Sequence, residues 1–524
     1  MKKHLDPPTP EATLSGGLRR YLYFTAAVTG SAVMIVEILG AKMLSPYLGT
    51  SHFVWTAQIA VTLVALACGY YAGGLLVDKS VRLGRLYGAI LVAGAYLAVT
   101  VAISERAAYF FLSFKLPTGS LLTSAFLFFV PLSLLAMVGP FFVRVLTQSV
   151  NTVGGNVGRL TAISTFGSFI GTILIGYLLI PYLRNSVTMF LTAALLMAVS
   201  GAYFFVWRRT LPVLARAVTV MALGLMPGYL HLRNEGMRGA RMVELYHANS
   251  NFGMLQVLQE KDGPRRLYVN DYLTQNTYDT NAHQSISMFT YMLHLLARAY
   301  TPRIDDVLCI GLGVGVVPME FARDGAKVDV IEINPAVVPL GERFFDLEPK
   351  RLNISFGDGR YFVNRAAKQY DAIILDAFLG DSCPSHLMTR EAFTAMRRNL
   401  KPEGTLVINT FADLRAGQDF FAASLHKTLQ AVFPSVRIHS VKREDRNTLF
   451  VASSNPNLAI LHPANFDQVH GNCVSEVRDA FETLRLTDPN HGIVLTDDFN
   501  PVEFKDAKNR ENLRRNLAVS MHEL

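Results

Sequence analysis

The sequence predicts a multi-pass α-helical membrane domain followed by an α/β doubly wound (Rossmann-like) domain, which begins with a small β-sheet. Of the 524 residues, 51% are hydrophobic and only 17% are charged, and the mean hydropathy of +0.27 argues against a wholly soluble protein. The composition changes near residue 233, where long apolar stretches give way to charged residues at the density of an ordinary globular protein. Beyond that point apolar strands alternate with helical segments, which predicts a parallel sheet covered on both faces.

Six apolar stretches in the first half are long enough, at about 20 residues each, to cross a bilayer. They lie at residues 21–43, 54–77, 85–104, 119–147, 159–181 and 186–207. A weaker seventh stretch, 211–230, contains Arg216 and Pro227. The first stretch is too long to be a cleaved signal peptide and lacks the flanking cleavage site. We therefore predict a cytoplasmic tail over residues 1–20 and a membrane domain of six or seven helices over residues 21–232.

Basic residues at the ends of these stretches predict their orientation, because positively charged loops stay in the cytoplasm. They precede the first stretch, separate the second from the third and follow the sixth: Lys2, Lys3, Arg19, Arg20, Lys79, Arg82, Arg85, Arg208 and Arg209. This distribution explains the net charge of +8 without nucleic-acid binding. If residues 211–230 crossed fully, the second half would lie outside the cell, so we expect either a re-entrant or interfacial segment there or a different number of crossings. The expected location is the cell inner membrane, with the second half in the cytoplasm.

Two features of the membrane half each allow a functional and a structural interpretation. The loop "GGLLVDKSVRLGR", residues 73–85, resembles the cytoplasmic loop of major-facilitator transporters, but a tight basic turn between helices has the same composition. Glu37 is an acid within a membrane stretch, which favours a functional role unless its side chain reaches the interface. The four cysteines are scattered without a CxxC pair, which predicts neither a disulfide framework nor a zinc site.

The second half divides into a small β-sheet domain over residues 240–285 and a larger domain over residues 286–524. Short β-like runs between polar turns predict an antiparallel sheet in the small domain: "MVELYH", "GMLQVLQ" and "RRLYVND". In the larger domain apolar strands such as "DVLCIGLG" and "YDAIILDAF" are each followed by a helix. The last two strands, "VRIHSVKRE" and "NTLFVASS", are joined by a polar turn and predict an antiparallel hairpin. A doubly wound sheet that ends in such a hairpin is the architecture of adenosylmethionine-dependent transferases.

Glycines and acids follow the first four strands of this sheet, and ligands of doubly wound sheets bind at the carboxyl ends of the strands. Glycines let the backbone approach a nucleoside closely, and a carboxylate about 20 residues later binds ribose hydroxyls. Two further acids end the third and fourth strands and face the same crevice. In chain order these residues are Gly311, Gly313, Glu332, Asp358, Gly359 and Asp376. The sequence therefore predicts a pocket for an adenosine-bearing ligand.

The same residues carry a resemblance to the spermidine synthase family of aminopropyltransferases, over roughly residues 242–455. Its motifs occur here in order as "LYVNDYLTQ", "VLCIGLGVG", "VDVIEIN", "SFGDGRYF" and "YDAIILDAF". The membrane half, with "EILGAKMLSPYLGTSHFVWT", resembles the membrane-fused members of that family. The resemblance implies that Gln275, Glu332, Asp358 and Gly359 contact the nucleoside of the donor, and that Asp376 is the catalytic carboxylate.

The reaction implied by the resemblance uses decarboxylated S-adenosylmethionine as donor. Its sulfonium activates the adjacent methylene, which an incoming amine attacks, and methylthioadenosine leaves. Because the attacking amine must be neutral, a carboxylate is needed to hold it and to take its proton. Positioning supplies most of the remaining rate enhancement, and no metal is required.

The chain departs from the family pattern where the acceptor is held. An aspartate of the glycine loop is replaced by Val314, and a polar pair that lines the polyamine site aligns with Met288 and Phe289. Acids that would rebuild an amine site come later in the chain, unless they form a solvated capping turn: Asp381, Asp497, Asp498 and Glu503.

These observations favour an integral-membrane aminopropyltransferase whose acceptor is an amine on a membrane lipid head group. Three alternatives stay open: a polyamine synthase with a membrane anchor or conduit, an S-adenosylmethionine-dependent methyltransferase, and a transporter with a nucleotide-sensing domain. The expected partners are therefore the bilayer and a lipid or polyamine acceptor, with no nucleic acid. Self-association into a homo-oligomer is left open by the sequence.

Overall fold

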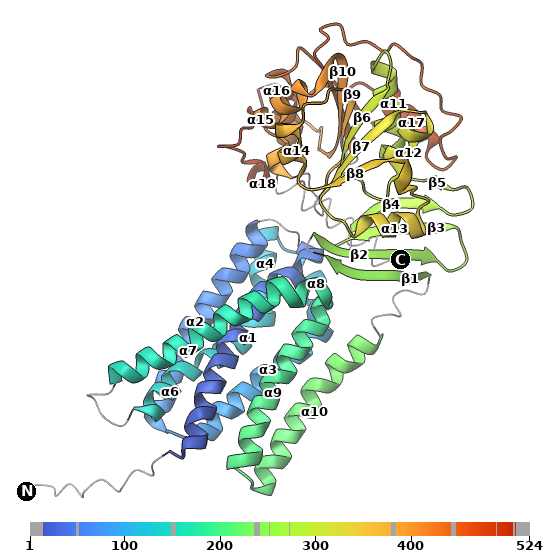
Figure 1. The fold of residues 1–524 in the computed structure, drawn as a ribbon. Coiled ribbons are helices and arrows are strands. Elements are labelled where there is room, and N and C mark those ends of the chain that lie inside the picture. Colours follow the sequence, from blue (N-terminus) through green and yellow to red (C-terminus); the bar gives the residue numbers. More distant parts are fainter. Residues whose placement is uncertain are drawn as a thin grey trace, which may run out of the picture. The chain divides into compact units, whose positions relative to one another are not determined.

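The chain folds into two compact units, which are described separately here (Figure 1). The computed structural model describes residues 14–48, 52–147, 153–234, 241–250, 252–271, 273–378, 384–441, 447–488, 490–506 and 509. One unit contains most of the helices up to Arg233, and the other is built around the strands and helices from Met242 onward.

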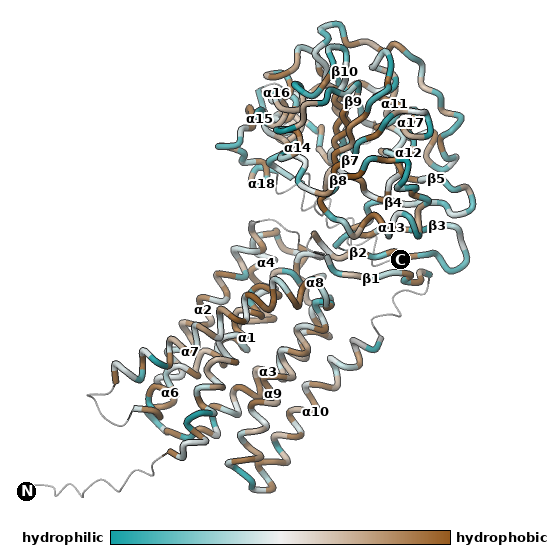
Figure 2. Tube along the Cα trace, viewed as in Figure 1, coloured by the Kyte–Doolittle hydropathy of each residue, from teal (hydrophilic) through white to brown (hydrophobic). Residues whose placement is uncertain are grey.

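The first unit is helical throughout its described residues. Its elements are α1 (Gly16–Leu48), α2 (His52–Lys79), α3 (Leu83–Phe111), α4 (Leu116–Ser124), α5 (Val130–Ala136), α6 (Val138–Leu146), α7 (Val153–Ile173), α8 (Ile180–Tyr182), α9 (Asn185–Trp207) and α10 (Leu211–Asn234). Two π-helical stretches, η1 (Ala125–Phe129) and η3 (Leu174–Leu179), join α4 to α5 and α7 to α8. Together these elements form seven apolar segments long enough to cross a membrane, and Figure 2 shows their hydrophobic character. The prediction of a multi-pass helical domain is confirmed.

The seventh segment corrects one expectation. Helix α10 runs without interruption over residues 211–234 and contains Pro227, so it lacks the reversal of direction that a re-entrant segment needs. It packs on α3, where a Cβ on Gly224 would come within 2.7 Å of Ala95 Cα. An odd number of full crossings would put residues 1–20 and the second half on opposite sides of the membrane, so the sidedness of the second half stays a prediction.

Both π-helical stretches end two residues before a proline. Pro131 follows η1 and Pro181 follows η3, each at the start of the next α-helix. A proline inside a helix lacks an N–H donor, and its ring collides with the carbonyl four residues earlier. A local widening to π geometry moves that carbonyl away, so the fourth and fifth segments continue past their prolines.

Glycines four residues apart bring neighbouring membrane helices into backbone contact. A Cβ on Gly167 of α7 would lie 2.1 Å from the Ala27 carbonyl oxygen of α1, and Gly171, one turn later, is equally crowded by Ser31. Two further pairs with this spacing, Gly69 with Gly73 and Gly224 with Gly228, are also crowded by a neighbouring helix. Small residues at these positions allow the close packing on which helix association in lipid depends.

The second unit begins with a five-stranded antiparallel sheet. Its strands are β1 (Met242–Ser250), β2 (Gly253–Glu260), β3 (Arg265–Asn270), β4 (Leu273–Asp279) and β5 (Gln284–Ser285), paired in chain order. The register moves from Tyr268 opposite Asn276 to Val269 opposite Thr274, so Gln275 is an extra, bulged residue. Such bulges redirect a side chain at the edge of a binding site.

The larger sheet has seven strands in the order β11-β12-β10-β9-β6-β7-β8. Its strands are β6 (Asp306–Ile310), β7 (Lys327–Glu332), β8 (Asn353–Phe356), β9 (Tyr370–Leu375), β10 (Leu400–Phe411), β11 (Ser435–Ser440) and β12 (Asn447–Ser453). Strands β10, β9, β6, β7 and β8 are parallel, whereas β12 is antiparallel to both β10 and β11. The predicted doubly wound sheet and its closing hairpin are therefore confirmed.

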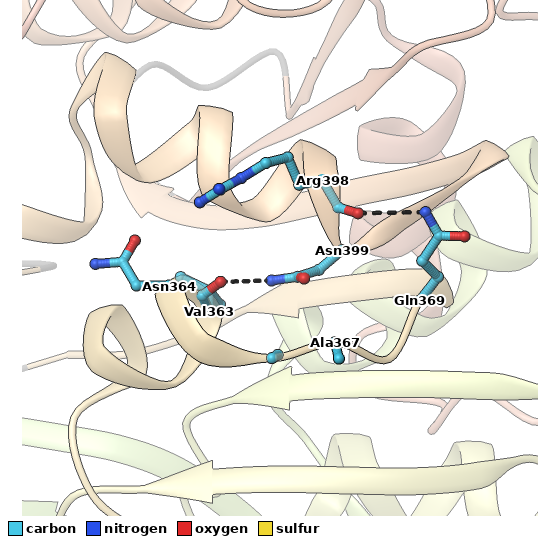
Figure 3. Close-up of a pocket in the computed structure, with 7 residues that line it drawn as sticks. Val363, Asn364, Ala367, Gln369, Arg398 and Asn399 are labelled. Carbon is cyan, nitrogen blue, oxygen red and sulfur yellow. Dashed lines mark hydrogen bonds between the residues drawn. The ribbon is translucent and has the colours of Figure 1, made fainter.

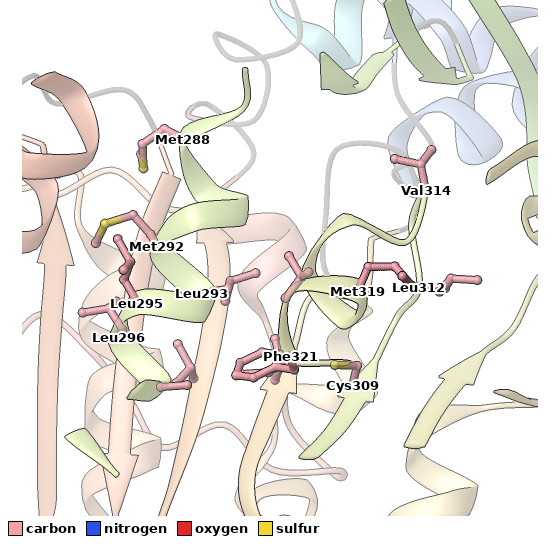
Figure 4. Packing of buried hydrophobic residues seen from close by; sticks show 14 of the residues in the cluster. Met288, Met292, Leu293, Leu295, Leu296, Cys309, Leu312, Val314, Met319 and Phe321 are labelled. Carbon is pink, nitrogen blue, oxygen red and sulfur yellow. The ribbon is translucent and has the colours of Figure 1, made fainter. Parts of the chain in front are cut away.

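Helices cover both faces of this sheet. They are α11 (Met288–Tyr300), α12 (Val316–Arg323), α13 (Val337–Phe344), α14 (Gly359–Arg365), α15 (Arg390–Arg398), α16 (Phe420–Gln430), α17 (Val474–Glu482) and α18 (Val502–Lys505). Alternate residues of each strand face opposite layers: Cys309 packs with α11 and α12, as Figure 4 shows, and Ile310 packs with the layer of α14 and α15. Because both faces are buried there, central strands such as β6 and β9 are almost continuously apolar, which is why they were predictable.

Candidate active site

The predicted site residues lie just after neighbouring strands, at the carboxyl ends of the strands of the larger sheet. The order β9-β6-β7-β8 places Asp376, Gly311, Glu332 and Asp358 side by side at the carboxyl ends of these strands. With about 4.8 Å between adjacent strands, Asp358 and Asp376 lie roughly 14 Å apart. That span suits an extended ligand with a nucleoside at one end and a reacting group at the other.

The glycine turn after β6 leaves no space for a side chain at its first position. Gly311 has φ of +100°, and a Cβ there would lie 2.3 Å from the Asp376 carbonyl oxygen. Gly313 also has a positive φ, of +55°, but nothing lies within 4 Å of the position that its Cβ would take. The turn thus packs against the residue that follows β9 on one side and leaves open space on the other.

Glu332, the last residue of β7, is held rigidly by backbone donors. Its side chain is buried, with the residue only 8% exposed, and its two oxygens accept hydrogen bonds from Leu312 N at 2.8 Å and Asn334 N at 2.7 Å. Burial raises the pKa of Glu332, and the backbone hydrogen bonds oppose that rise. Each carboxylate oxygen keeps a second lone pair, so the group can still accept from a diol.

Asp358 caps the helix that follows β8. Its Oδ1 accepts from Tyr361 N at 2.9 Å, and its Oδ2 lies 2.9 Å from His386 Nε2. A Cβ on the next residue, Gly359, would lie 2.5 Å from Ile310 Cγ2, so that glycine allows α14 to pack closely on β6. Gln275 is half-buried at its bulge in β4. The nucleoside contacts of Gln275, Asp358 and Gly359 stay predictions.

Asp376 is held by an amide network that sequence reasoning missed. Asn409 of β10 donates from Nδ2 to Asp376 Oδ1 at 2.9 Å, and Asn447 of β12 donates from Nδ2 to Asn409 Oδ1, also at 2.9 Å. Burial raises the pKa of Asp376 to about 6, while the hydrogen bond from Asn409 lowers it. A carboxylate with that pKa is ionised near neutral pH yet retains appreciable basicity. The only signal in the sequence is an amide within the otherwise apolar strand "GTLVINTF".

Removing the amide donor should shift the pH dependence of any reaction that uses Asp376 as a base. In Asn409→Leu the carboxylate loses a hydrogen bond worth about 1.5–3 kcal/mol, so its pKa rises by about one to two units. We expect the acidic limb of the kcat/KM profile to move to higher pH by that amount. Asn447→Ala, which leaves the direct bond in place, should move it less. Profiles measured from pH 5 to 9 that coincide for the wild type and Asn409→Leu would exclude this role.

The apolar replacements near the predicted acceptor site occupy different environments. Phe289, near the start of α11, is partly buried and packs against the core, and Met288 is 5% exposed. Val314 is only 3% exposed and belongs to the same core cluster, labelled in Figure 4. The side chain that replaces the aspartate of the family pattern at Val314 therefore faces the core.

The acids that were expected to rebuild an amine site differ in their surroundings. Asp497 accepts from Arg360 Nη2 at 2.9 Å and from Thr389 Oγ1 at 2.6 Å, which joins α14 to the N-cap of α15. This arrangement matches the capping turn considered as its alternative. Asp498 is exposed and Glu503 lies in α18, and an acceptor role for either stays a prediction. Asp381 lies outside the described residues.

Two cavities of the second unit lie away from the carboxyl ends of the strands, where the site is. The smaller, about 320 Å³, is lined by residues such as Val363, Gln369 and Asn399, where α14 and α15 lead into β9 and β10 (Figure 3). It therefore opens at the amino ends of the strands, opposite the site. The larger, about 960 Å³, follows α11 and α12 and reaches the glycine turn only through Gly315 and Val316. Within the described ranges, no group of three or more His, Cys, Asp or Glu side chains is arranged to hold a metal ion.

Comparisons with known proteins find similarity to aminopropyltransferases and to a methyltransferase. Residues 287–442 match the family described as "Spermine/spermidine synthase domain". A polyamine aminopropyltransferase of Vibrio vulnificus is 38% identical over 131 residues, which cover 24% of this chain and 44% of the relative. An N-terminal histidine N-methyltransferase of Emericella nidulans is 32% identical over 145 residues, 26% of this chain and 25% of the relative.

A third relative extends further along the chain. It is a polyamine aminopropyltransferase of Oceanobacillus iheyensis, 23% identical over 448 residues, which cover 80% of this chain and 82% of the relative. That alignment is longer than the second half of the chain and therefore includes part of the helical unit. The chain spans less than half of the length of the first two relatives.

Proposed function

We propose that this chain, whose residues 287–442 form a spermine/spermidine synthase domain, is an aminopropyltransferase carried by a membrane-spanning helical domain. The donor is decarboxylated S-adenosylmethionine. The observation that carries the proposal is the position of Asp376, a carboxylate with a raised pKa beside a glycine turn and in line with the buried Glu332.

In the proposed reaction each group at the strand ends has one task. Glu332 binds the ribose hydroxyls, and Asp358 with Gly359 and Gln275 contacts the nucleoside. The acceptor nitrogen attacks the methylene carbon next to the sulfonium, and the carbon–sulfur bond breaks with its electron pair going to sulfur. Methylthioadenosine therefore leaves as a neutral thioether, and Asp376 accepts the proton that the acceptor nitrogen loses. Asn409 keeps the Asp376 oxygen that it contacts in a fixed direction.

We propose that the acceptor is an amine presented by the membrane, such as a lipid head group. Two features support it: seven apolar segments on the same chain, and the partly buried Phe289 near the start of α11, at a position where the family pattern has a polar residue. A free polyamine is the second candidate acceptor, because two relatives are named polyamine aminopropyltransferases. A methyltransferase using S-adenosylmethionine is a third reading, favoured by the similarity to the Emericella nidulans protein.

One experiment separates these readings. The detergent-solubilised full chain is incubated with decarboxylated or intact S-adenosylmethionine and with a lipid amine, putrescine or spermidine, and the products are weighed by mass spectrometry. We expect an added aminopropyl unit on the lipid amine, formed well above the rate on the free polyamines, and only with the decarboxylated donor. Transfer to free polyamines alone would favour an anchor or conduit role for the helices. An added methyl group would identify a methyltransferase, and the absence of any product would contradict the proposal and favour a transporter with a nucleotide sensor.

The proposal places the catalytic unit in the cytoplasm, where adenosyl donors are made. Arg208 and Arg209, which follow α9, fit a cytoplasmic loop under the positive-inside rule, so the proposal requires α10 to lie along the membrane surface rather than to cross it. Cysteine-accessibility mapping that found a cysteine introduced at Arg303, an exposed residue before β6, only on the outer face would contradict this location.

A further inference from the structure

An aromatic pair lies directly beyond the pair formed by Asp376 and Asn409. Phe378 comes two residues after Asp376, and Phe411, the last residue of β10, comes two residues after Asn409. The two ring centroids are 5.2 Å apart, and the ring planes are tilted by 57°. Side chains two residues apart on a strand point to the same face of the sheet, so Phe411 lies on the face where Asn409 contacts Asp376. The carboxylate is therefore followed, farther along the strand direction, by two phenyl rings.

These rings are accessible to a ligand. Asp376, Phe378 and Phe411 are each partly exposed, whereas Asn409 is only 1% exposed. Doubly wound sheets bind their ligands at the carboxyl ends of the strands, which is where these residues lie. A ligand that places a nitrogen on Asp376 is thus expected to lay the carbons next to that nitrogen against the rings.

We propose that Phe378 and Phe411 determine the specificity for the acceptor by selecting a monoamine over a polyamine. The inference rests on the proposed function, because it concerns the amine that Asp376 deprotonates. Two residues along a strand span about 6.6 Å, which is similar to the length of a four-carbon chain. With one nitrogen of putrescine on Asp376, the second ammonium would reach the level of the rings and lose hydration there, whereas a hydrocarbon chain would leave water favourably.

Neighbouring charges decide how an aromatic pair is used, because a phenyl face can also attract a cation. A second ammonium that leaves water needs a carboxylate as its partner. The first acid after Phe411 along the chain is Asp413, which is only 7% exposed. Arg415 donates from Nε to both carboxylate oxygens of Asp413, at 3.0 Å to each. Asp413 is therefore already neutralised, and the rings offer a surface for an uncharged chain.

Two kinds of molecule offer this chemistry. In phosphatidylethanolamine two methylenes follow the ammonium before the phosphate, and in a free alkylamine the methylenes continue as a hydrocarbon chain. Both present one ammonium with apolar carbons beside it. Putrescine and spermidine differ from both because they carry further ammonium groups.

Pentylamine and putrescine are matched probes, because they have the same number of heavy atoms and differ only in a terminal methyl or ammonium group. The full-length protein in phosphatidylcholine nanodiscs, saturated with methylthioadenosine, is titrated with each amine by calorimetry. No donor is present, so binding is measured without turnover. We expect pentylamine to bind at least tenfold more tightly than putrescine. Equal binding of the two amines, or tighter binding of putrescine, would overturn the proposal without the need for any variant.

Variants of the two rings test which residues set this preference. Phe378→Ala and Phe411→Ala should each weaken pentylamine binding at least threefold and leave putrescine binding unchanged. Phe411→Asp places a carboxylate at the level of the second ammonium and should shift the preference towards putrescine by at least tenfold. Phe362→Ala removes a partly buried phenylalanine of α14 that packs in the other layer, and it should leave the ratio of the two affinities unchanged. A ratio that keeps its wild-type value in every variant of both rings would overturn the assignment.

The transfer assay separates this inference from the proposed function. With the decarboxylated donor, preferential transfer to a monoamine supports both, and phosphatidylethanolamine in the nanodiscs or pentylamine in solution then identifies the source. Preferential transfer to putrescine would retain the aminopropyltransferase and overturn the selection of a monoamine. Tighter binding of pentylamine in a protein that forms no product would retain the monoamine site and overturn the proposed function. Retained methylthioadenosine binding verifies that each variant has folded.

Discussion

Asp376→Asn should reduce the rate of aminopropyl transfer by about two to four orders of magnitude, the usual contribution of a general base. The substitution keeps the shape of the side chain and its position after β9, but an amide cannot accept the proton that the attacking amine loses. Because Glu332 and Asp358 follow other strands, methylthioadenosine binding should change little. Single-turnover rates and calorimetric titrations of the same preparation measure both quantities. Turnover close to the wild-type rate would exclude Asp376 as the base.

The stability of this variant provides its control. Burial raises the pKa of Asp376 from 3.8 to about 6, so the folded protein binds more protons than the unfolded chain between these two values. The free energy of unfolding therefore falls as the pH rises through this window, and the ionised carboxylate is destabilising above it. Asp376→Asn should accordingly be at least as stable as the wild type at pH 8. A variant that is inactive but less stable at that pH would point to a structural cause instead.

Glu332→Ala should weaken the binding of methylthioadenosine and of the donor by about 1–3 kcal/mol, the scale of a lost hydrogen bond to a charged group. The alanine variant also leaves Leu312 N and Asn334 N without their acceptor, which loosens the glycine turn against the ribose. The effect should appear mainly in the donor KM and in the calorimetric Kd, with a smaller change in kcat.

A matched control lies on the next helix. Glu320 of α12 forms an ion pair with Arg323 at 2.5 Å and is not placed at the strand ends. Glu320→Ala removes a carboxylate of the same kind and should leave the nucleoside affinity within experimental error. An equal loss of affinity in both variants would mean that the overall negative charge, rather than the contact made by Glu332, controls donor binding.

The parallel core of the second unit was predictable because burial on both faces leaves little choice of residue. Strands such as β6 and β9 are almost continuously apolar, so their ends, and therefore the positions of Gly311 and Asp376, can be found in the sequence. The small sheet was only partly predicted, with three apolar runs recognised where the structure has five strands. Strand β4, which carries Gln275, is polar enough to resemble a turn.

What escaped prediction depends on contacts between distant residues. Asn409 and Asp376 are 33 residues apart, and Asp497 meets Arg360 across 137 residues, so no local pattern indicates either pair. The orientation of Val314 was also inaccessible, because an apolar residue in a glycine turn suits a pocket wall and a core equally well.

The glycine pairs of α2, α7 and α10 mean that the two halves of the chain accept different kinds of amino-acid substitution. A single added methyl at Gly167 or Gly69 meets a backbone carbonyl, and a backbone cannot move aside as a flexible side chain can. Lipid offers no compensating drive to reclose separated helices, since their apolar surfaces are as soluble in the bilayer as in each other. Large apolar residues on the exposed surface of the membrane half, such as Leu63 and Phe166, should therefore be exchangeable for one another, whereas the glycines at the helix crossings should not. The sheet of the second half is restricted differently, by the need to fill two buried layers at every position.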